Sequence, residues 1–299
     1  MTTPSQVGRD RQRVLTSRLE SLAKGPWLIT AAVMLATFME VLDTTVVNVS
    51  LTHIAGSLSA TTSEATWALT SYLVANGIVI PISGWLAHRL GRKNLLLIST
   101  AGFTLASLLC GIAPSMGLLV TFRVIQGACG GSLQPLSQAV LLETFPPKRH
   151  GMAMAIYGLG VIVAPVLGPV LGGWLTDNFS WRWVFFINLP FGLLSLFMIM
   201  TFLKDPHYIR RSSAPIDSWG LGALVIWVAA LQIMLDKGQE EDWFSSRFIV
   251  VLAVAFAVGI VAWVVRELST PHPAAELRVF GQRTFAAGTL AMAVIGFVM

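Results

Sequence analysis

Apolar runs of about twenty residues recur along this chain, and a helix needs about that length to cross the roughly 30 Å hydrocarbon core of a bilayer. The eight complete runs cover residues 27–49, 65–87, 95–113, 117–142, 151–175, 183–203, 219–235 and 248–265. A ninth run begins near Thr284, and the sequence stops within it at Met299. The pattern predicts an all-α polytopic membrane protein with eight complete spans and the start of a ninth.

The composition supports this fold class. The chain is 55% hydrophobic and 12% charged, whereas soluble domains average about 25% charged residues. Glycine and proline inside several spans are tolerable because neighbouring helices can satisfy the freed backbone groups. No run alternates apolar and polar residues with period two, so a barrel of transmembrane strands is excluded. The lipid bilayer is therefore the first expected partner of this chain.

Basic residues gather in the N-terminal tail and in alternate loops. These residues are Arg9, Arg11, Arg13, Arg18, Lys24, Arg89, Arg92, Lys93, Lys148, Arg149, Lys204, Arg210, Arg211, Arg266, Arg278 and Arg283. Loops rich in Lys and Arg stay in the cytoplasm, so the N-terminus is predicted to be cytoplasmic. The formal net charge of +5 is explained by this topology, and no nucleic-acid partner is expected. The first run is too long for a cleaved signal peptide and is expected to be retained.

Three charged residues lie inside spans. Glu40 and Asp43 occupy the first span, and Arg123 is the only Lys or Arg well inside any span. A rise of about 1.5 Å per residue places all three within roughly 10 Å of the outer boundary of the hydrocarbon core. Because a charge at membrane depth costs at least about 2.5 kcal/mol, such residues usually have a function.

The three charges predict a proton-coupling site. An acid that releases its proton when an arginine approaches, and regains it when the arginine withdraws, provides a physical basis for proton coupling. A purely structural ion pair is the alternative for Asp43 and Arg123, and Glu40 could instead be an acid that packs between helices.

The fifth span is unusually rich in glycine and proline. The residues concerned are Gly158, Gly160, Pro165, Gly168, Pro169, Gly172 and Gly173. Small residues four positions apart let helices approach closely, and proline bends or hinges a helix. We expect two interruptions of the helical hydrogen bonds and a moving or tightly sealed interface, with tight packing alone as the alternative.

The sequence contains no sign of an enzyme. No glycine-rich run ends in Lys-Ser or Lys-Thr, and no cluster of His and carboxylate residues has metal-ligand spacing. Neither a cofactor nor a metal is expected, so energy would have to come from an ion gradient. Trp27, Trp181 and Trp219 lie near span ends, where tryptophan usually anchors a helix at the membrane interface.

Several ordered motifs resemble those of one family. Residues 42–49 (Leu-Asp-Thr-Thr-Val-Val-Asn-Val) resemble its first-helix motif, and residues 123–127, with Arg123, Gln126 and Gly127, resemble its fourth-helix motif. Residues 84–93 resemble its loop motif, 158–173 its antiporter motif, and 181–190 a stretch typical of one subgroup. The chain therefore resembles the N-terminal part of a major facilitator superfamily transporter, in the fourteen-span drug:proton antiporter family of the EmrB/QacA type.

The resemblance implies a proton-driven antiporter that exports hydrophobic toxic, drug-like compounds across the bacterial inner membrane. It also implies a periplasmic adaptor protein and an outer-membrane channel as partners. Conformational gating would fall to the residues of the loop between the second and third spans, namely Gly84, His88, Arg89, Gly91, Arg92 and Lys93. The family usually has an aspartate at the position of His88, and a histidine that is neutral or weakly charged at pH 7 does not replace that acid.

The resemblance also implies a domain order. Residues 1–26 would be a basic cytoplasmic tail, 27–203 the N-terminal six-helix bundle, 204–216 a cytoplasmic linker, 217–266 an extra transmembrane hairpin, and 267–299 a cytoplasmic loop with a truncated ninth span. A transporter of this fold forms its cavity between two bundles. We therefore expect the 299 residues to be a fragment that lacks the C-terminal half and does not transport alone.

Two other functions stay open at this point. The same fold could serve a symporter or importer of a small metabolite, although the antiporter motif in the fifth span argues against it. The chain could also be a membrane-embedded assembly or regulatory protein without transport, a possibility supported only by the unfinished ninth span.

Overall fold

A computed structural model describes residues 25–203, 217–270, 273 and 277–298. The basic tail up to Lys24 and the linker residues 204–216 lie outside these described residues, as do the predictions made for them. Within the described parts all regular secondary structure is helical, and eight helical segments are long and apolar enough to cross a membrane. The predicted count of complete spans is therefore confirmed.

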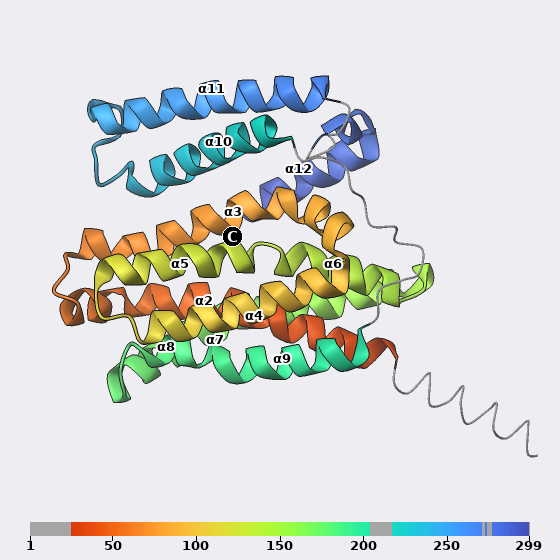
Figure 1. Ribbon diagram of the computed structural model, residues 1–299, viewed down its shortest axis with the longest axis horizontal. Helices are drawn as coiled ribbons and strands as arrows, with labels where there is room; N and C mark the ends of the chain where they lie inside the picture. Colours follow the sequence, from red (N-terminus) through yellow and green to blue (C-terminus); the bar gives the residue numbers. More distant parts are fainter. Residues whose placement is uncertain (1–24, 204–216, 271–272, 274–276, 299) are drawn as a thin grey trace, which may run out of the picture.

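The spans lie side by side, and the connections between successive spans alternate between the two ends of the molecule (Figure 1). They are α2 (Pro26–Ser57), α3 (Thr62–Leu90), α4 (Arg92–Gly111), α5 (Met116–Gly130), α6 (Leu133–Thr144), α7 (His150–Asn178), α8 (Trp183–Phe186), α9 (Asn188–Phe202), α10 (Ser218–Lys237), α11 (Arg247–Ser269) and α12 (Arg283–Val298). Short 3-10 turns cover Pro147–Arg149, Trp243–Ser245 and Leu277–Gly281. The first helix continues to Ser57, past the predicted end of its span at residue 49.

Two spans that were predicted as single helices are interrupted. In the fourth span, α5 ends at Gly130 and α6 begins at Leu133. At this interruption the backbone packs tightly against α3. A Cβ added to Gly131 would lie 2.5 Å from the backbone oxygen of Asn76, so a larger residue would not fit there. In the sixth span, a short α8 precedes α9, with Ile187 between them.

The prediction of a loop over residues 84–93 is wrong. Helix α3 runs through this segment to Leu90, and α4 begins at Arg92, so Gly91 alone joins the two helices. Gly91 has φ 86, a left-handed conformation that glycine adopts without the steric cost of a Cβ. The basic residues of the motif therefore lie on helix ends rather than on a loop.

The fifth span is one continuous helix. Helix α7 runs from His150 to Asn178 and contains Pro165 and Pro169. Each proline removes one backbone donor, so the two expected interruptions of the helical hydrogen bonds are present. They do not break α7, because an apolar environment favours keeping the remaining hydrogen bonds inside the helix.

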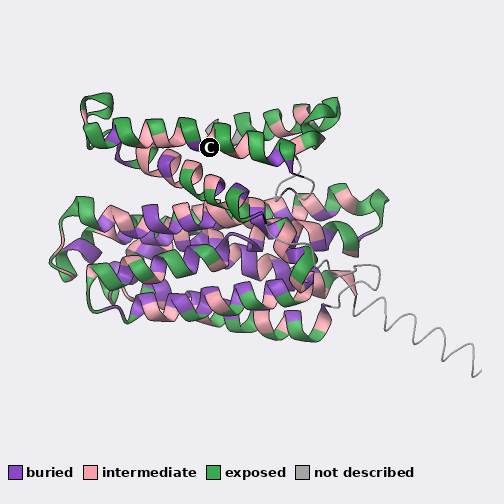
Figure 2. Ribbon diagram, turned by 45° about the horizontal axis from the view of Figure 1, so that its top comes forward, coloured by how far each residue is buried: buried purple, intermediate pink, exposed green. Residues whose placement is uncertain are grey.

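The bundle has two apolar cores, one toward each end of the helices. Along α2, residues up to Met39 belong to the first core, and residues from Leu42 onward belong to the second. The charged residues Glu40 and Asp43 are buried at the junction of the two cores. Figure 2 shows buried residues concentrated in the α2–α9 bundle, whereas the α10–α11 hairpin is largely exposed. The bundle is therefore built around a polar layer in mid-helix.

One tryptophan was misassigned as an interfacial anchor. Trp27 and Trp219 are 48% and 80% exposed, in agreement with such a role, but Trp181 is only 4% exposed. Its ring packs edge-on against Phe185 with centroids 6.1 Å apart, and the Arg182 guanidinium lies 4.2 Å from its centroid. Trp181 is therefore part of the second apolar core.

Candidate functional site

The centre of the polar layer is an ion pair between α2 and α5. Arg123 donates a hydrogen bond to the Asp43 carboxylate, and both side chains are completely removed from solvent. The two residues were predicted to lie at the same depth, and in the structure they are in direct contact. An ion pair of this kind is stable in an apolar interior only where further hydrogen bonds satisfy both charges.

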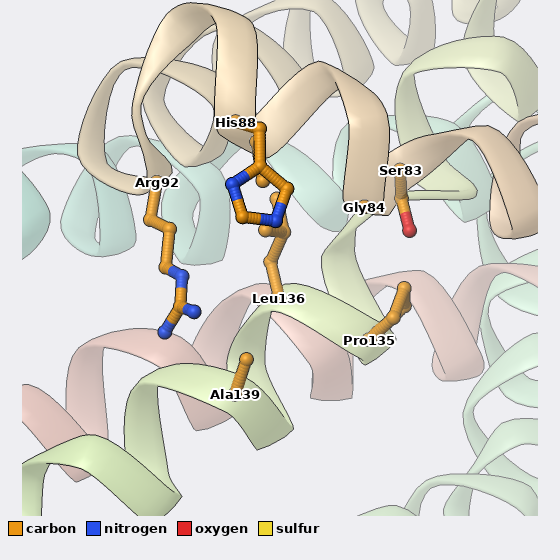
Figure 3. Close-up of a pocket in the computed structure, with 8 residues that line it drawn as sticks. Ser83, Gly84, His88, Arg92, Pro135, Leu136 and Ala139 are labelled. Atoms are coloured by element: carbon orange, nitrogen blue, oxygen red, sulfur yellow. The ribbon is translucent and has the colours of Figure 1, made fainter. Parts of the chain in front are cut away.

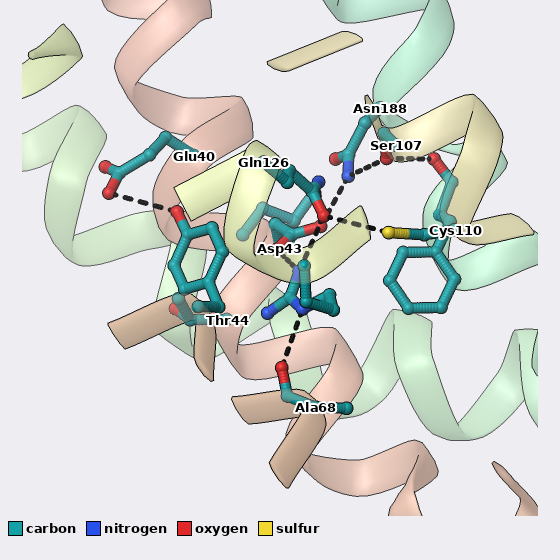
Figure 4. A network of polar contacts seen from close by, with 12 residues as sticks. Glu40, Asp43, Thr44, Ala68, Ser107, Cys110, Gln126 and Asn188 are labelled. Carbon is teal, nitrogen blue, oxygen red and sulfur yellow. Dashed lines mark hydrogen bonds and ion pairs between the residues drawn. The ribbon is translucent and has the colours of Figure 1, made fainter. Parts of the chain in front are cut away.

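Such hydrogen bonds are present on the Asp43 side. Gln126 Nε2 and Asn188 Nδ2 donate to Asp43 Oδ1 at 2.9 and 2.7 Å. Asn188 Nδ2 also donates to Ser107 Oγ at 3.0 Å, which links α9 to α4 (Figure 4). The carboxylate therefore receives donors from α5 and α9, and one of them carries a full positive charge.

Arg123 is held from several sides as well. Its Nε donates to the backbone oxygen of Ala68 at 2.8 Å, and its Nη1 donates to Gln126 Oε1 at 2.8 Å. The guanidinium lies 4.2 Å from the centroid of the Tyr72 ring, a position that favours a cation. Its Nη2 is buried and has no hydrogen-bond partner. The arginine is thus fixed in place but keeps one unused donor.

Glu40 has a different environment, although it lies less than one helical turn from Asp43. Its carboxylate accepts hydrogen bonds from Tyr72 Oη at 3.3 Å, Asn76 Nδ2 at 3.0 Å and Gln134 Nε2 at 2.8 Å. All three donors are neutral, and Arg123 is not among them. The structure therefore divides the predicted three-residue site into an ion pair and a separate carboxylate.

The fourth-helix motif has a packing role beside the arginine. A Cβ added to Gly127 would overlap the backbone oxygen of Tyr72. Only glycine at this position lets α5 approach α3 closely enough for Arg123 to reach Ala68. The motif therefore combines a cation, the amide of Gln126 and a close helix contact in one turn.

The glycines of α7 fall into two groups. Gly160, Gly168 and Gly172 face α2, where an added Cβ would meet Met34, Thr45 and Val46 respectively. Gly158 and Gly173 have no atom within 4 Å of such a Cβ. The expectation of tight packing therefore applies to one face of α7, and the hydrogen bond of 3.0 Å between Ser50 and Thr176 lies along the same interface.

The gating residues predicted from the loop motif lie at the end of the bundle where α3 turns into α4. His88 and Arg92 face α6 across a pocket of about 120 Å³ (Figure 3). The pocket is lined by Ser83, Gly84, Ala87, His88, Arg92, Pro135, Leu136 and Ala139. Arg92 forms an ion pair with Glu143 of α6, and Lys93 Nζ donates to the Met200 backbone oxygen of α9 at 2.8 Å.

The remaining cation of this motif, Arg89, lies 5.3 Å from the Trp85 ring centroid. Two of the basic residues, Arg92 and Lys93, therefore join three helix ends. The gating role of the whole set stays a prediction.

Several members of the polar layer were not predicted from the sequence. These residues are Tyr72, Asn76, Ser107, Gln134 and Asn188. Each is a polar side chain within an apolar run, which is the signal that could have identified them. Among the described residues there is no group of three metal-ligating side chains.

A family model agrees with this architecture. The model described as Major Facilitator Superfamily matches residues 33–299, which include the whole polar layer. The chain belongs to the Major Facilitator Superfamily. Its fold and relatives are those of transporters rather than enzymes.

Multidrug export and resistance proteins are among the relatives that the chain resembles. The chain is 48% identical over 263 residues to multidrug export protein EmrB of Haemophilus influenzae, covering 88% of this chain and 51% of the relative. It is 45% identical to EmrB of Escherichia coli, covering 89% of this chain and 52% of the relative. Fatty acid resistance protein FarB of Neisseria gonorrhoeae is 43% identical, with coverage of 91% and 53%. These relatives confirm the predicted subgroup, and the chain spans about half their length.

Solved structures support the fold alone. A peptide transporter, POT, in complex with sulfate matches with a TM-score of 0.60 at 16% identity, covering 83% of this chain and 53% of that chain. The xylose transporter XylE from E. coli matches with a TM-score of 0.54 at 17% identity, with coverage of 81% and 58%. Both are similar to this chain in architecture, and the chain is a multi-pass membrane protein.

Proposed function

We propose that the full-length protein is a proton-driven multidrug exporter that moves hydrophobic toxic compounds out of a bacterial cell. The observation that carries this proposal is the fully buried ion pair between Asp43 and Arg123. The similarity to multidrug export relatives supports the substrate class. A charge pair at membrane depth is costly to maintain, which favours a function in ion coupling.

The mechanism follows from the geometry of the polar layer. Asp43, Glu40 and Arg123 lie on α2 and α5, which occupy equivalent positions in the two three-helix repeats of this fold. Movement of α5 relative to α2 would change the distance between Arg123 and the two carboxylates. A carboxylate that loses its cation gains a proton more readily, so this movement would couple proton binding to alternating access.

Orientation and partners are also part of the proposal. Arg92, Lys93, Lys148 and Arg149 lie near one end of the bundle, which is the end that the positive-inside rule assigns to the cytoplasm. The N-terminus would then be cytoplasmic, and the protein would lie in the inner membrane. A periplasmic adaptor protein and an outer-membrane channel would receive the exported compound.

The test is drug-stimulated proton flux in proteoliposomes that contain the full-length protein. Wild type is compared with Asp43→Asn and Arg123→Ala, with membrane level and folding checked for each. Loss of flux in both variants would support a coupling pair. Wild-type flux in Asp43→Asn would contradict a coupling role for the pair, and absence of drug-stimulated flux in wild type would contradict proton-driven export altogether.

The 299 residues expressed alone provide a second test of the same mechanism. Transport in this fold requires a cavity between two bundles, so we expect no drug-coupled proton flux from this segment. Uptake rather than extrusion of the compound by the full-length protein would instead favour an importer of the same fold.

A further inference from the structure

The interruption of the fourth span lies beside Glu40. Gly130 and Gly131 end α5 against α3, where an added Cβ on Gly130 would lie 3.0 Å from Tyr72 Oη and 3.3 Å from Asn76 Nδ2. Gln134, in the first turn of α6 after the interruption, donates to Glu40 Oε2. All three donors to Glu40 are thus positioned by the interruption or by the helix packed against it. Discontinuous helices in transporters often build ion sites in this way.

The two buried carboxylates differ in how their charge is balanced. Asp43 is paired with a guanidinium and receives two further amide donors. Glu40 is 4% exposed and receives only neutral donors. An ionised carboxylate without a cation is strongly disfavoured in an apolar interior, whereas the neutral acid is not. Because Asp43 keeps its cation in this conformation, its charge does not need a proton for compensation.

We propose that Glu40 is the residue that binds and releases the transported proton, and that Asp43 is the permanent counter-ion of Arg123. The site consists of Glu40 with Tyr72, Asn76 and Gln134, at the interruption between α5 and α6. A proton from water binds to a Glu40 carboxylate oxygen and gives a neutral carboxyl group. It returns to water when the site opens to the other side of the membrane.

The surroundings of Glu40 allow this change of charge. The titratable groups that face it are Asp43 on α2, Tyr72 on α3 and Tyr157 on α7, and the charged Arg123 lies against the Tyr72 ring. Tyr72 lies between Glu40 and the Asp43–Arg123 pair. Its hydroxyl contacts Glu40, and its ring lies against the Arg123 guanidinium. Among the three donors to Glu40, Gln134 alone is only partly buried. In this proposal water would reach Glu40 past Gln134.

The unused Nη2 of Arg123 gives the release step a physical basis. This donor is buried and has no partner in the present arrangement. A shift of α5 toward Glu40 would offer it a carboxylate and would favour loss of the Glu40 proton. Asp43 would retain Asn188, which lies on α9, as a donor during such a shift.

The inference rests on the proposed proton-driven export, and the experiment separates the two. Drug-coupled proton flux and uncoupled drug exchange are measured in proteoliposomes of the full-length protein, for wild type, Glu40→Gln and Glu64→Gln. We expect Glu40→Gln to lose coupled proton flux while it retains drug exchange. Glu64 is an exposed glutamate in the capping box of α3, and glutamine preserves that box, so Glu64→Gln should retain both activities.

The outcomes are distinct. Absence of coupled flux in wild type contradicts the proposed function itself. Coupled flux in wild type together with undiminished flux in Glu40→Gln overturns the inference and leaves proton-driven export intact. Drug transport that requires sodium and persists without a proton gradient contradicts both proton-driven export and the role of Glu40, because the protein would then couple to another ion.

An infrared measurement distinguishes a proton carrier from a structural acid. Drug binding to wild type should remove a carbonyl stretch of a protonated carboxyl group, and this band should be absent from Glu40→Gln. If Glu40→Gln does not fold, Glu40→Asp keeps a carboxyl group in the site and should shift the band. A drug-induced band that is unchanged in Glu40→Asp would assign the proton to another residue and refute the proposal.

Discussion

At the scale of single residues, the carboxylate of Asp43 and the guanidinium of Arg123 are both completely buried. Each charge is stabilised by the other and by Gln126, which donates to Asp43 and accepts from Arg123. Removing one member of a buried pair leaves the other charge uncompensated, whereas replacing both with apolar residues is often neutral. The pair is thus better explained by function than by stability.

This reasoning predicts a non-additive double-mutant cycle. Asp43→Leu and Arg123→Met should each lower the free energy of unfolding by about 3 to 5 kcal/mol. The double variant should lose less than either single variant, because it leaves no unpaired charge at this contact. Denaturant unfolding in detergent micelles measures all four free energies. Additive losses would show that the two residues do not form a pair in the folded protein.

The sequence was sufficient to place these charges but not to assign their partners. Helical rise alone brings Asp43 and Arg123 to a common depth. It does not show that Glu40, on the same helix, contacts Tyr72, Asn76 and Gln134 instead of the arginine. That difference depends on how α3 and α6 pack against α2. The depth of a residue in the membrane does not specify which neighbouring helix its side chain contacts.

At the scale of secondary-structure elements, the contact between α2 and α7 is controlled by one face of α7. Gly168 and Gly172 lie against Thr45 and Val46, whereas Gly173 faces open space. The glycine-rich motif therefore contains both packing positions and positions without a packing constraint. Spacing alone did not distinguish them, because neighbouring glycines in a helix point in different directions.

Alanine substitutions separate the two groups. Gly168→Ala places a methyl group against Thr45 and should cost about 1 to 3 kcal/mol of stability, as other overpacked contacts do. Gly173→Ala is the matched control and should be neutral or stabilise the helix by about 0.5 to 1 kcal/mol. Thermal unfolding in detergent checks both. Equal effects of the two variants would mean that α7 does not contact α2 through Gly168.

The ends of the α10–α11 hairpin are joined by a further ion pair, which makes the stability of this element sensitive to pH. Arg266 Nε donates to Asp217 Oδ2 at 2.8 Å, and Asp217 caps α10 through Gly220 N–H at 3.2 Å. The hydrogen bond from Arg266 lowers the pKa of Asp217 below its usual value. A lowered carboxyl pKa in the folded state stabilises the fold above the ordinary pKa, and this stability is lost as the pH falls through the lowered pKa.

Asp217→Asn should therefore loosen the first turn of α10 at neutral pH and have little effect at a pH below the lowered pKa. Hydrogen exchange of the α10 backbone, measured for wild type and variant across this pH range, tests the prediction. A difference between the two proteins that does not depend on pH would show that ionisation of Asp217 does not stabilise the hairpin.

At the scale of the whole molecule, the hairpin is attached to the bundle through the opposite end of α10. Lys237 is 3% exposed, and its Nζ donates to the Ser63 backbone oxygen at 3.0 Å and to Glu240 Oε2 at 2.9 Å. Asp236, the residue directly before Lys237, accepts a hydrogen bond from Thr70 of α3. The hairpin is therefore docked on α3 and is expected to move with the N-terminal bundle.

Loss of the lysine charge should release this attachment. In Lys237→Met, spin labels at the exposed positions Thr62 and Gln239 should report a longer and broader distance distribution than in the otherwise wild-type protein. Lys148→Met removes an exposed lysine far from α10 along the chain and should leave the distribution unchanged. An unchanged distance in Lys237→Met would mean that apolar packing alone holds the hairpin against α3.

The sequence by itself determined the fold class, the number of spans, the subgroup and the depth of the buried charges. The fold class, the spans and the depth of the charges depend on local hydrophobicity and on the fixed rise of a helix, both of which are properties of a single segment. The subgroup followed instead from the resemblance of ordered motifs to those of one family. Tertiary structure alone decided the interruption at Gly131, the continuity of α7, the burial of Trp181 and the separate environment of Glu40. Each of these depends on a contact between segments that are distant in the chain, where the backbone or side chain adjusts to a neighbour that the local sequence does not specify.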